Sequence, residues 1–182
     1  MKKNIEYDLI IVILVIFLAV LSFAVKNDAF SNIDTTKPVE KELIAKKEYS
    51  NYAWARVRHG YGFFSDGSIY YFEFDEDDYK SYKKVSNKKE YTDYILNNGH
   101  SVRNGMIKND VDILLNSIDK LNEDDKDFYR NCRGADMGST IYSVFKGTEE
   151  IVLKETGDCD GYSKSYNSRT ILDIIEKNIP RY

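Results

Sequence analysis

The stretch YGFFSDGSIYYFEF, residues 61–74, contains the strongest strand and turn signal of the chain. Asp66-Gly67 lies between two aromatic runs, and this dipeptide favours a type I′ turn because both central positions need a positive φ. The stretch therefore predicts an antiparallel hairpin with strands at 61–64 and 69–74. Alternation along the second strand places Tyr70, Phe72 and Phe74 on one face of a sheet and Ile69, Tyr71 and Glu73 on the other.

Further strand and helix signals surround this hairpin. Residues 52–58, 140–145 and 150–155 predict strands, the last two as a second hairpin. Helices are predicted from a cap at Asn87 to Gly99, along the apolar stripe of residues 107–121, and from near Ser168 to Pro180. Residues 131–139 and 156–166 are predicted as loops. This order of elements predicts an α+β domain, with a mainly antiparallel sheet of about four or five strands packed on one face against about three helices.

Before this domain, residues 9–25 (LIIVILVIFLAVLSFAV) form a run without a charged side chain. A helix of this length just crosses a hydrocarbon core of ~30 Å. Lys2 and Lys3 precede the run and favour a cytoplasmic N-terminus. We therefore expect a single-pass membrane protein, with a short tail at 1–8 and a signal anchor at 9–25.

Two other topologies remain compatible with this run. Ser22 and Ala24 are small residues in the pattern of a signal-peptide cleavage site, so cleavage near Ala24 would release a secreted protein. A reversed anchor would leave the domain in the cytoplasm, since Lys26, Lys37 and Lys41 keep the charge asymmetry across the run slight. Residues 26–47 mix charged residues, Asn and Thr without apolar periodicity, and predict a flexible stalk. The compact extracytoplasmic domain is then expected at 48–182.

Charge limits the partners of this domain. The chain has 26 basic and 30 acidic side chains. Of these, 19 basic and 24 acidic side chains belong to residues 48–182, which are therefore acidic overall. Affinity for nucleic acid comes from basic surface, so we expect no nucleic-acid partner. The abundance of Asn, Lys, Ile and Tyr is typical of bacteria with low-GC genomes.

Tyrosine is the most abundant aromatic residue, with 15 of the 182 residues. In a strand-rich domain most tyrosines cover half-buried sheet surface. An exposed aromatic platform for a ligand is the alternative. Its candidate binding residues, all on predicted strands, are Trp54, Tyr61, Phe63, Tyr70 and Tyr71.

The two cysteines, Cys132 and Cys159, are 27 positions apart. Outside the cytoplasm such a pair favours a disulfide, which would contribute roughly 3 kcal/mol by restricting the unfolded chain. Two buried thiols or one catalytic thiol are the alternatives.

The loop Gly157-Asp158-Cys159-Asp160-Gly161 is the second candidate site. Asp158 and Asp160 offer two carboxylates beside a sulfur atom, although Asp and Gly are also ordinary turn residues. The loop has too few ligands for a calcium motif, and His59 and His100 show no zinc-binding spacing. We expect no metal and no cofactor.

The sequence contains no Gly-rich phosphate loop, nucleophile elbow or HExxH motif. Their absence favours a non-catalytic binding module for a protein, a peptide or a polymer of the cell envelope. One alternative is an envelope hydrolase or transferase that uses the Asp158-Cys159-Asp160 loop. Another is a membrane-anchored immunity or sensor protein.

Overall fold

The computed structural model describes residues 41–51, 57–74, 85–126, 128–134 and 138–180. Within them the elements follow one another as β1 (Leu43–Asn51), β2 (Val57–Phe64), β3 (Ile69–Phe74), α3 (Lys88–Asn98), β4 (His100–Ser101), α4 (Lys108–Asp119), the 3₁₀ helix η2 (Glu123–Asp125), β5 (Asn131–Cys132), β6 (Ser139–Lys146), β7 (Glu149–Gly157), β8 (Cys159–Tyr162) and α5 (Tyr166–Asn178). The described part of the chain is α+β, with an antiparallel sheet and three α-helices, so the predicted fold class is confirmed.

The sheet is larger than predicted. It has eight strands in the order β4-β3-β2-β1-β6-β7-β8-β5, where about four or five were expected. Two of the additional strands, β4 and β5, are only two residues long. A third, β8, lies inside the segment 156–166 that the sequence predicts as a loop. β4 and β5 are too short to show a period of two, and the four residues of β8 include the Asp and Gly that usually mark turns.

The first strand lies partly in the predicted stalk. β1 begins at Leu43, so residues 43–47 belong to the sheet and the predicted domain boundary at Lys47 is wrong. Leu43 and Ala45 are fully buried. An apolar triplet among charged residues has no periodicity of its own, and only its pairing with β2 and β6 makes it a core strand. Residues 52–56, which the sequence assigns to a strand, lie outside the described residues.

The predicted hairpin at 61–74 is present as β2 and β3, paired from Arg58↔Phe74 to Phe63↔Ile69. Its turn differs from the predicted type I′ turn. Gly67 N donates to Phe64 O at 2.9 Å and Phe64 N donates to Ser68 O at 3.0 Å. Ser65 and Asp66 therefore occupy the central positions, and Gly67, at φ 85°, follows them as in a three-residue loop with a glycine bulge.

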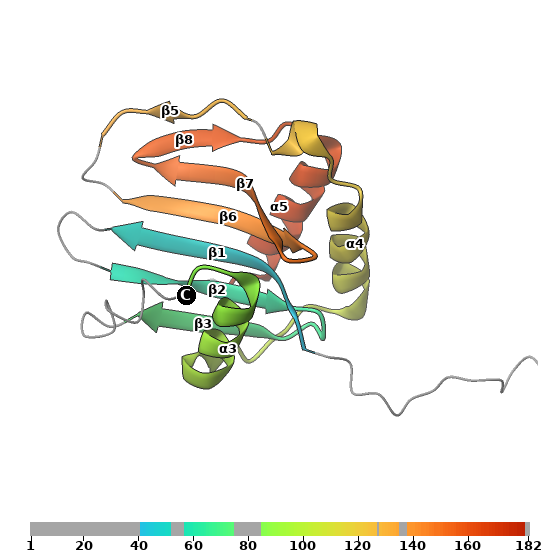
Figure 1. Cartoon of the computed structure of the whole chain (residues 1–182). Coiled ribbons are helices and arrows are strands. Elements are labelled where there is room, and N and C mark those ends of the chain that lie inside the picture. The colour runs from blue at the N-terminus through green and yellow to red at the C-terminus, as the bar shows by residue number, and fades with distance from the viewer. Residues whose placement is uncertain (1–40, 52–56, 75–84, 127, 135–137, 181–182) are drawn as a thin grey trace, which may run out of the picture. The chain divides into compact units, whose positions relative to one another are not determined.

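Helices cover both faces of the sheet (Figure 1). Tyr91 and Ile95 of α3 pack against Phe72 and Phe74 on one face. On the other face, α4 and α5 pack against a cluster that includes Ile69. The prediction of one covered face is therefore wrong. The physical reason is that β3 has a buried side chain on each face: Ile69 is fully buried on one face and Phe72 is 1% exposed on the other, although Glu73 is exposed.

A buried charge cluster lies between the sheet and α3. Glu48 Oε2 accepts hydrogen bonds from Lys46 Nζ at 3.1 Å, from Arg58 Nη2 at 3.1 Å and from the Tyr91 hydroxyl at 3.0 Å, and Arg58 Nε donates to Glu48 Oε1. Lys46 Nζ also lies 3.1 Å from Glu150 Oε1. The described residues contain no buried side-chain polar atom without a partner. This cluster is part of the packed interior, because Lys46, Glu48 and Arg58 are each less than a tenth exposed.

None of the helices in the described ranges is long and apolar enough to cross a membrane. Residues 9–25 lie outside those ranges, so the membrane anchor stays a prediction from the sequence.

Candidate functional site

The five predicted aromatic binding residues do not form one platform. Trp54 lies outside the described residues, and Phe63 is fully buried in the core, so its assignment to an exposed surface is wrong. Tyr70 packs on the α3 side, where its hydroxyl accepts a hydrogen bond from Lys41 Nζ at 3.0 Å. Tyr61 and Tyr71 lie on the opposite face, next to each other in register. The alternation of a strand separates these side chains, as the sequence itself predicts for β3.

Tyr61 and Tyr71 belong to a row of side chains that crosses the α5 face of the sheet. Strand register aligns it as Tyr162, Lys154, Tyr142, Lys47, Tyr61, Tyr71 and His100. At its centre the Tyr142 hydroxyl donates to Glu176 Oε1 of α5 at 2.6 Å. Lys47 and Lys154 lie within 4.0 and 3.5 Å of the same carboxylate.

Titration of this row follows from its contacts. Burial and the hydrogen bond to Glu176 raise the pKa of Tyr142 far above its ordinary value. Burial alone would raise the pKa of Glu176, but the Tyr142 hydroxyl and the charges of Lys47 and Lys154 outweigh it and lower that pKa. Tyr142 is thus a fixed donor and Glu176 a fixed carboxylate. The centre of the row ties α5 to the sheet.

Cys132 and Cys159 lie directly opposite each other on β5 and β8 and are joined by a disulfide. The version of the hydrolase or transferase hypothesis that needs a free Cys159 thiol is therefore wrong. Asp158 also has a structural contact, because its Oδ2 accepts a hydrogen bond from Gly138 N at 3.2 Å. Asp160 Oδ1 accepts a hydrogen bond from Gly157 N at 3.3 Å, but Asp160 is exposed and borders an open hollow.

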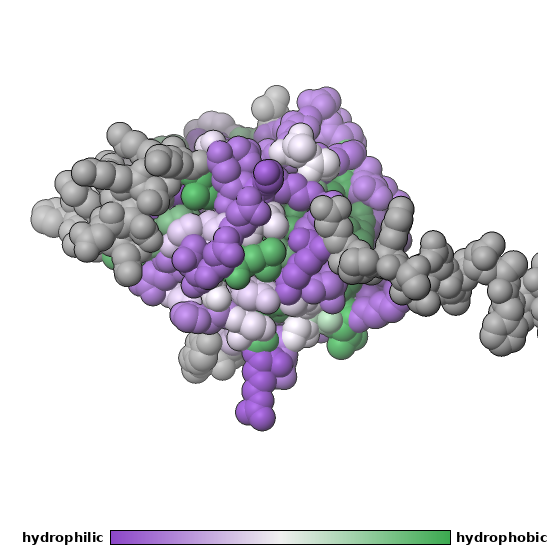
Figure 2. Space-filling view, turned by 60° about the horizontal axis from the view of Figure 1, so that its bottom comes forward, coloured by the Kyte–Doolittle hydropathy of each residue, from purple (hydrophilic) through white to green (hydrophobic). Residues whose placement is uncertain are grey.

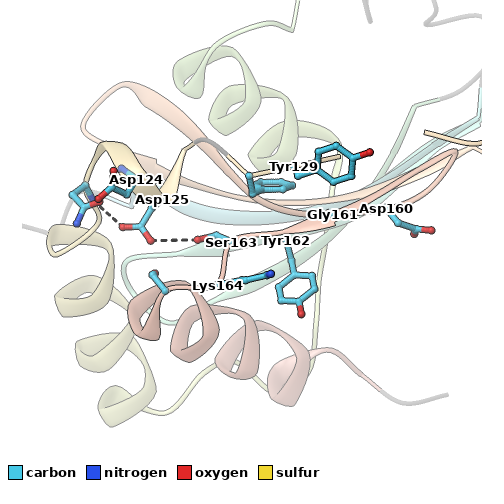
Figure 3. A pocket seen from close by; sticks show the side chains of 11 residues that line it. Asp124, Asp125, Tyr129, Asp160, Gly161, Tyr162, Ser163 and Lys164 are labelled. Carbon is cyan, nitrogen blue, oxygen red and sulfur yellow. Dashed lines mark hydrogen bonds between the residues drawn. The ribbon is translucent and has the colours of Figure 1, made fainter. Parts of the chain in front are cut away.

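This hollow, which we call the edge groove, runs along β8 and has a volume of about 700 Å³ (Figure 3). It is lined by Asn122, Asp124, Asp125, Phe128 and Tyr129 on one side and by residues 160–165 on the other. The two sides come from parts of the chain separated by more than 30 positions, and the disulfide lies beside them. Tertiary folding alone creates the groove.

Two local features fix the walls of the edge groove. Gly161 lets the segment of Phe128 and Tyr129 pack closely against β8. A Cβ atom at position 161 would lie 2.7 Å from Tyr129 O and 2.9 Å from the Phe128 ring. Asp125 is almost fully buried and joins three elements. It accepts from Asn122 N at 2.9 Å, from Ser168 Oγ at 3.1 Å and from Ser163 Oγ at 3.3 Å.

These contacts keep Asp125 ionised. Burial alone would raise its pKa, but hydrogen bonds from serine hydroxyls and from Asn122 N outweigh burial and lower the pKa below the ordinary value. Hydrogen bonds within the protein already occupy three of the about four acceptor positions of this carboxylate. Asp125 holds the wall in place, and the exposed residues around it make the surface available for contact.

The contact surface of the edge groove consists of aromatic rings and charged side chains. Tyr129 is 86% exposed and Tyr162 51% exposed, and Figure 3 draws them on opposite sides of the β8 segment that contains Gly161. Asp124, Asp160 and Lys164 are exposed beside them. Such a groove can stack flat apolar groups on tyrosine rings and bind hydroxyl or amino groups with the carboxylates.

Sequence reasoning named Asp160 but missed Tyr129, Tyr162 and Lys164. Tyr162 and Lys164 directly follow the Asp158-Cys159-Asp160 loop, so aromatic and basic residues next to that glycine-rich loop were an available signal. No feature of the sequence could have indicated Tyr129, because only the fold brings it close to β8. In the described part of the chain, no group of three or more His, Cys, Asp or Glu side chains could hold a metal ion.

No protein-family model, curated protein or solved structure matches this chain. Its fold and its groove are therefore interpreted from their own residues.

Proposed function

We propose that this chain is a non-catalytic binding module whose ligand-contacting surface is the edge groove, held at the outer face of a bacterial cell membrane by residues 9–25. The observation that carries the proposal is the exposure of Tyr129 and Tyr162, 86% and 51%, on the two sides of one groove. Tyrosine is enriched at binding surfaces, because its ring offers a large contact area at a low entropic cost.

The walls of the edge groove support the same proposal. Asp125 and the Cys132–Cys159 disulfide fix both walls before any ligand arrives. A site that is already ordered loses little conformational entropy on binding. The groove is open along the edge of the sheet, so an extended ligand suits it: a peptide, a segment of a protein or a polymer of the cell envelope.

Co-sedimentation of the full chain, purified in detergent, tests this proposal. Two partner preparations are used in separate arms: isolated insoluble cell-wall polymer and a solubilised envelope-protein fraction immobilised on beads. We expect binding in one arm, and Tyr129→Ala and Tyr162→Ala each to weaken it about tenfold or more.

Tyr166→Ala is the matched control, because Tyr166 is 82% exposed and does not line the edge groove. It should bind like the unmodified chain. The proposal fails if the unmodified chain binds in neither arm, or if the two groove variants bind as well as Tyr166→Ala does.

A further inference from the structure

A second hollow lies at the other end of α5. It has a volume of about 600 Å³ and is bordered by Tyr71, His100, Arg103 and Asn104 on one side and by Lys177 and Asn178 on the other. The 13-residue helix α5 starts beside Ser165 of the edge groove and ends here, a length of about 20 Å. The two hollows share no lining residue, so they are separate sites.

Hydrogen-bond donors dominate this second hollow. Its lining contains Arg103, Lys177 and His100 but no Asp or Glu, although residues 48–182 hold 24 acidic and 19 basic side chains. Two carboxylates outside the lining contact residues that border it. Glu73 Oε2 accepts a hydrogen bond from the Tyr71 hydroxyl at 3.3 Å. The other carboxylate is that of Asp110. It accepts bonds from Lys177 Nζ at 3.0 and 2.9 Å and from Asn178 Nδ2 at 3.1 Å.

Arg103 is the cation of this hollow that has no partner in the described part of the chain. No hydrogen bond or ion pair there involves its side chain, which is exposed. A guanidinium offers a planar set of donors that matches the two oxygens of a carboxylate or phosphate. Arg103 therefore supplies both the charge and the geometry for an anion.

The loop that contains Arg103 is anchored on both sides. Val102 N donates to Ile69 O at 2.8 Å, and Met106 N donates to Gly67 O at 2.7 Å. Gly105 lies so close to the hairpin turn that a Cβ atom there would be 2.5 Å from Gly67 O. The backbone of Arg103 is thus held against the β2–β3 hairpin, which reduces the ordering needed to bind a ligand.

One feature of this hollow opposes an anion. The last turn of α5 ends at Asn178, and the carbonyl end of a helix carries partial negative charge. Asn178 Nδ2 donates to Ile174 O at 2.9 Å, and the ammonium group of Lys177, which is paired with Asp110, belongs to the same turn. These contacts offset the helix end, but Arg103 must provide the main attraction.

We propose that this hollow is an anion-binding site for a carboxylate or phosphate group, with Arg103 as its principal ligand and Asn104, His100 and Lys177 as further donors. The Tyr71 ring borders the site and suits a ligand whose anionic group is attached to a flat or apolar body. This proposal is independent of the edge groove.

The test is a titration of the full chain in detergent with sodium phosphate and with sodium acetate, at constant ionic strength maintained with chloride. Binding is followed by NMR shifts of the arginine side-chain N–H signals. We expect saturation with a Kd on the order of 1 mM for at least one of the two anions. The anion that binds more tightly identifies the preferred group, phosphate or carboxylate.

Arg103→Gln should weaken this binding about tenfold or more, because it removes the charge and the planar pair of donors. Arg169→Gln is the matched control, since Arg169 is an exposed arginine near the opposite end of α5. It should leave the Kd unchanged. Absence of saturation with either anion, or equal binding by Arg103→Gln and Arg169→Gln, overturns the proposal.

Discussion

Glu48 is the residue on which the buried charges beneath α3 depend. It is 7% exposed and is the shared acceptor for Lys46, Arg58 and Tyr91. Replacing it by Gln would remove the buried negative charge that Lys46 and Arg58 share. We expect Glu48→Gln to lower the free energy of unfolding by about 3–5 kcal/mol, measured by urea unfolding followed by circular dichroism.

Asp112→Asn is the control for this prediction. Asp112 forms an exposed ion pair with Lys108 at 2.8 Å, and such surface pairs contribute about 1 kcal/mol or less. Similar losses in the two variants would contradict the special role of the buried cluster.

The same scale shows what a sequence can reveal about single side chains. The alternation along Ile69–Phe74 predicts the faces of Tyr70, Phe72 and Tyr71, and the structure confirms them. The alternation does not predict whether the Phe63 side chain is exposed or buried. Alternation assigns a residue to a face, whereas burial depends on which helix covers that face, and here α4 and α5 cover it.

At the scale of elements, Asp125 joins η2, the end of β8 and the first turn of α5. Its pKa in the folded protein is lower than the ordinary value of 3.8. The ionised form is therefore stabilised by folding. This contribution is complete above pH 3.8 and is lost as the pH falls through the folded pKa.

We expect Asp125→Asn to be less stable than the unmodified chain at about pH 6, by roughly 1–3 kcal/mol, because an amide cannot accept all three hydrogen bonds. This difference should shrink at about pH 3, where the carboxylate of the unmodified chain begins to gain a proton. Urea unfolding at both pH values measures it. Asp110, whose pKa is also lowered, titrates in both proteins, so its effect cancels in the comparison. A difference that stays constant with pH would contradict the role of an ionised Asp125.

Elements with several turns or a turn signal were predictable, and elements defined only by pairing were not. The cap at Asn87 marks the start of α3. The apolar stripe of residues 107–121 identifies α4, because its helical spacing repeats over several turns. The short strand β8 has no such repeat. Its four residues form a strand because β7 and β5 pair with it on either side. The edge groove could not be predicted for the same reason.

At the scale of the whole molecule, helices on both faces leave the edges and ends of the sheet for contact with ligands. The face visible in Figure 2 is mostly hydrophilic, and its coloured residues show only small, separate apolar patches. The edge groove and the anion-binding hollow lie at the two ends of α5. Both combine segments far apart in the sequence, so the sequence could name single residues at them, Asp160 and Tyr71, but could not assemble either hollow.

The orientation of the whole chain in the membrane can be tested through its disulfide. Disulfides persist in oxidising compartments, so the Cys132–Cys159 bond supports an extracytoplasmic domain. We expect a membrane-impermeant maleimide to label intact cells only after treatment with an impermeant reductant. Cys132 is exposed, so reduction gives the reagent a thiol that it can reach.

Variants and lysates make the outcomes of this labelling distinct. Cys159→Ser leaves the exposed Cys132 without its partner and should permit labelling without reductant. Labelling of the unmodified chain without reductant would contradict the disulfide. If reduced intact cells stay unlabelled while denatured lysate is labelled, the domain faces the cytoplasm, because burial cannot protect the exposed Cys132. That result would overturn the proposed anchor orientation and, with it, every ligand outside the cell.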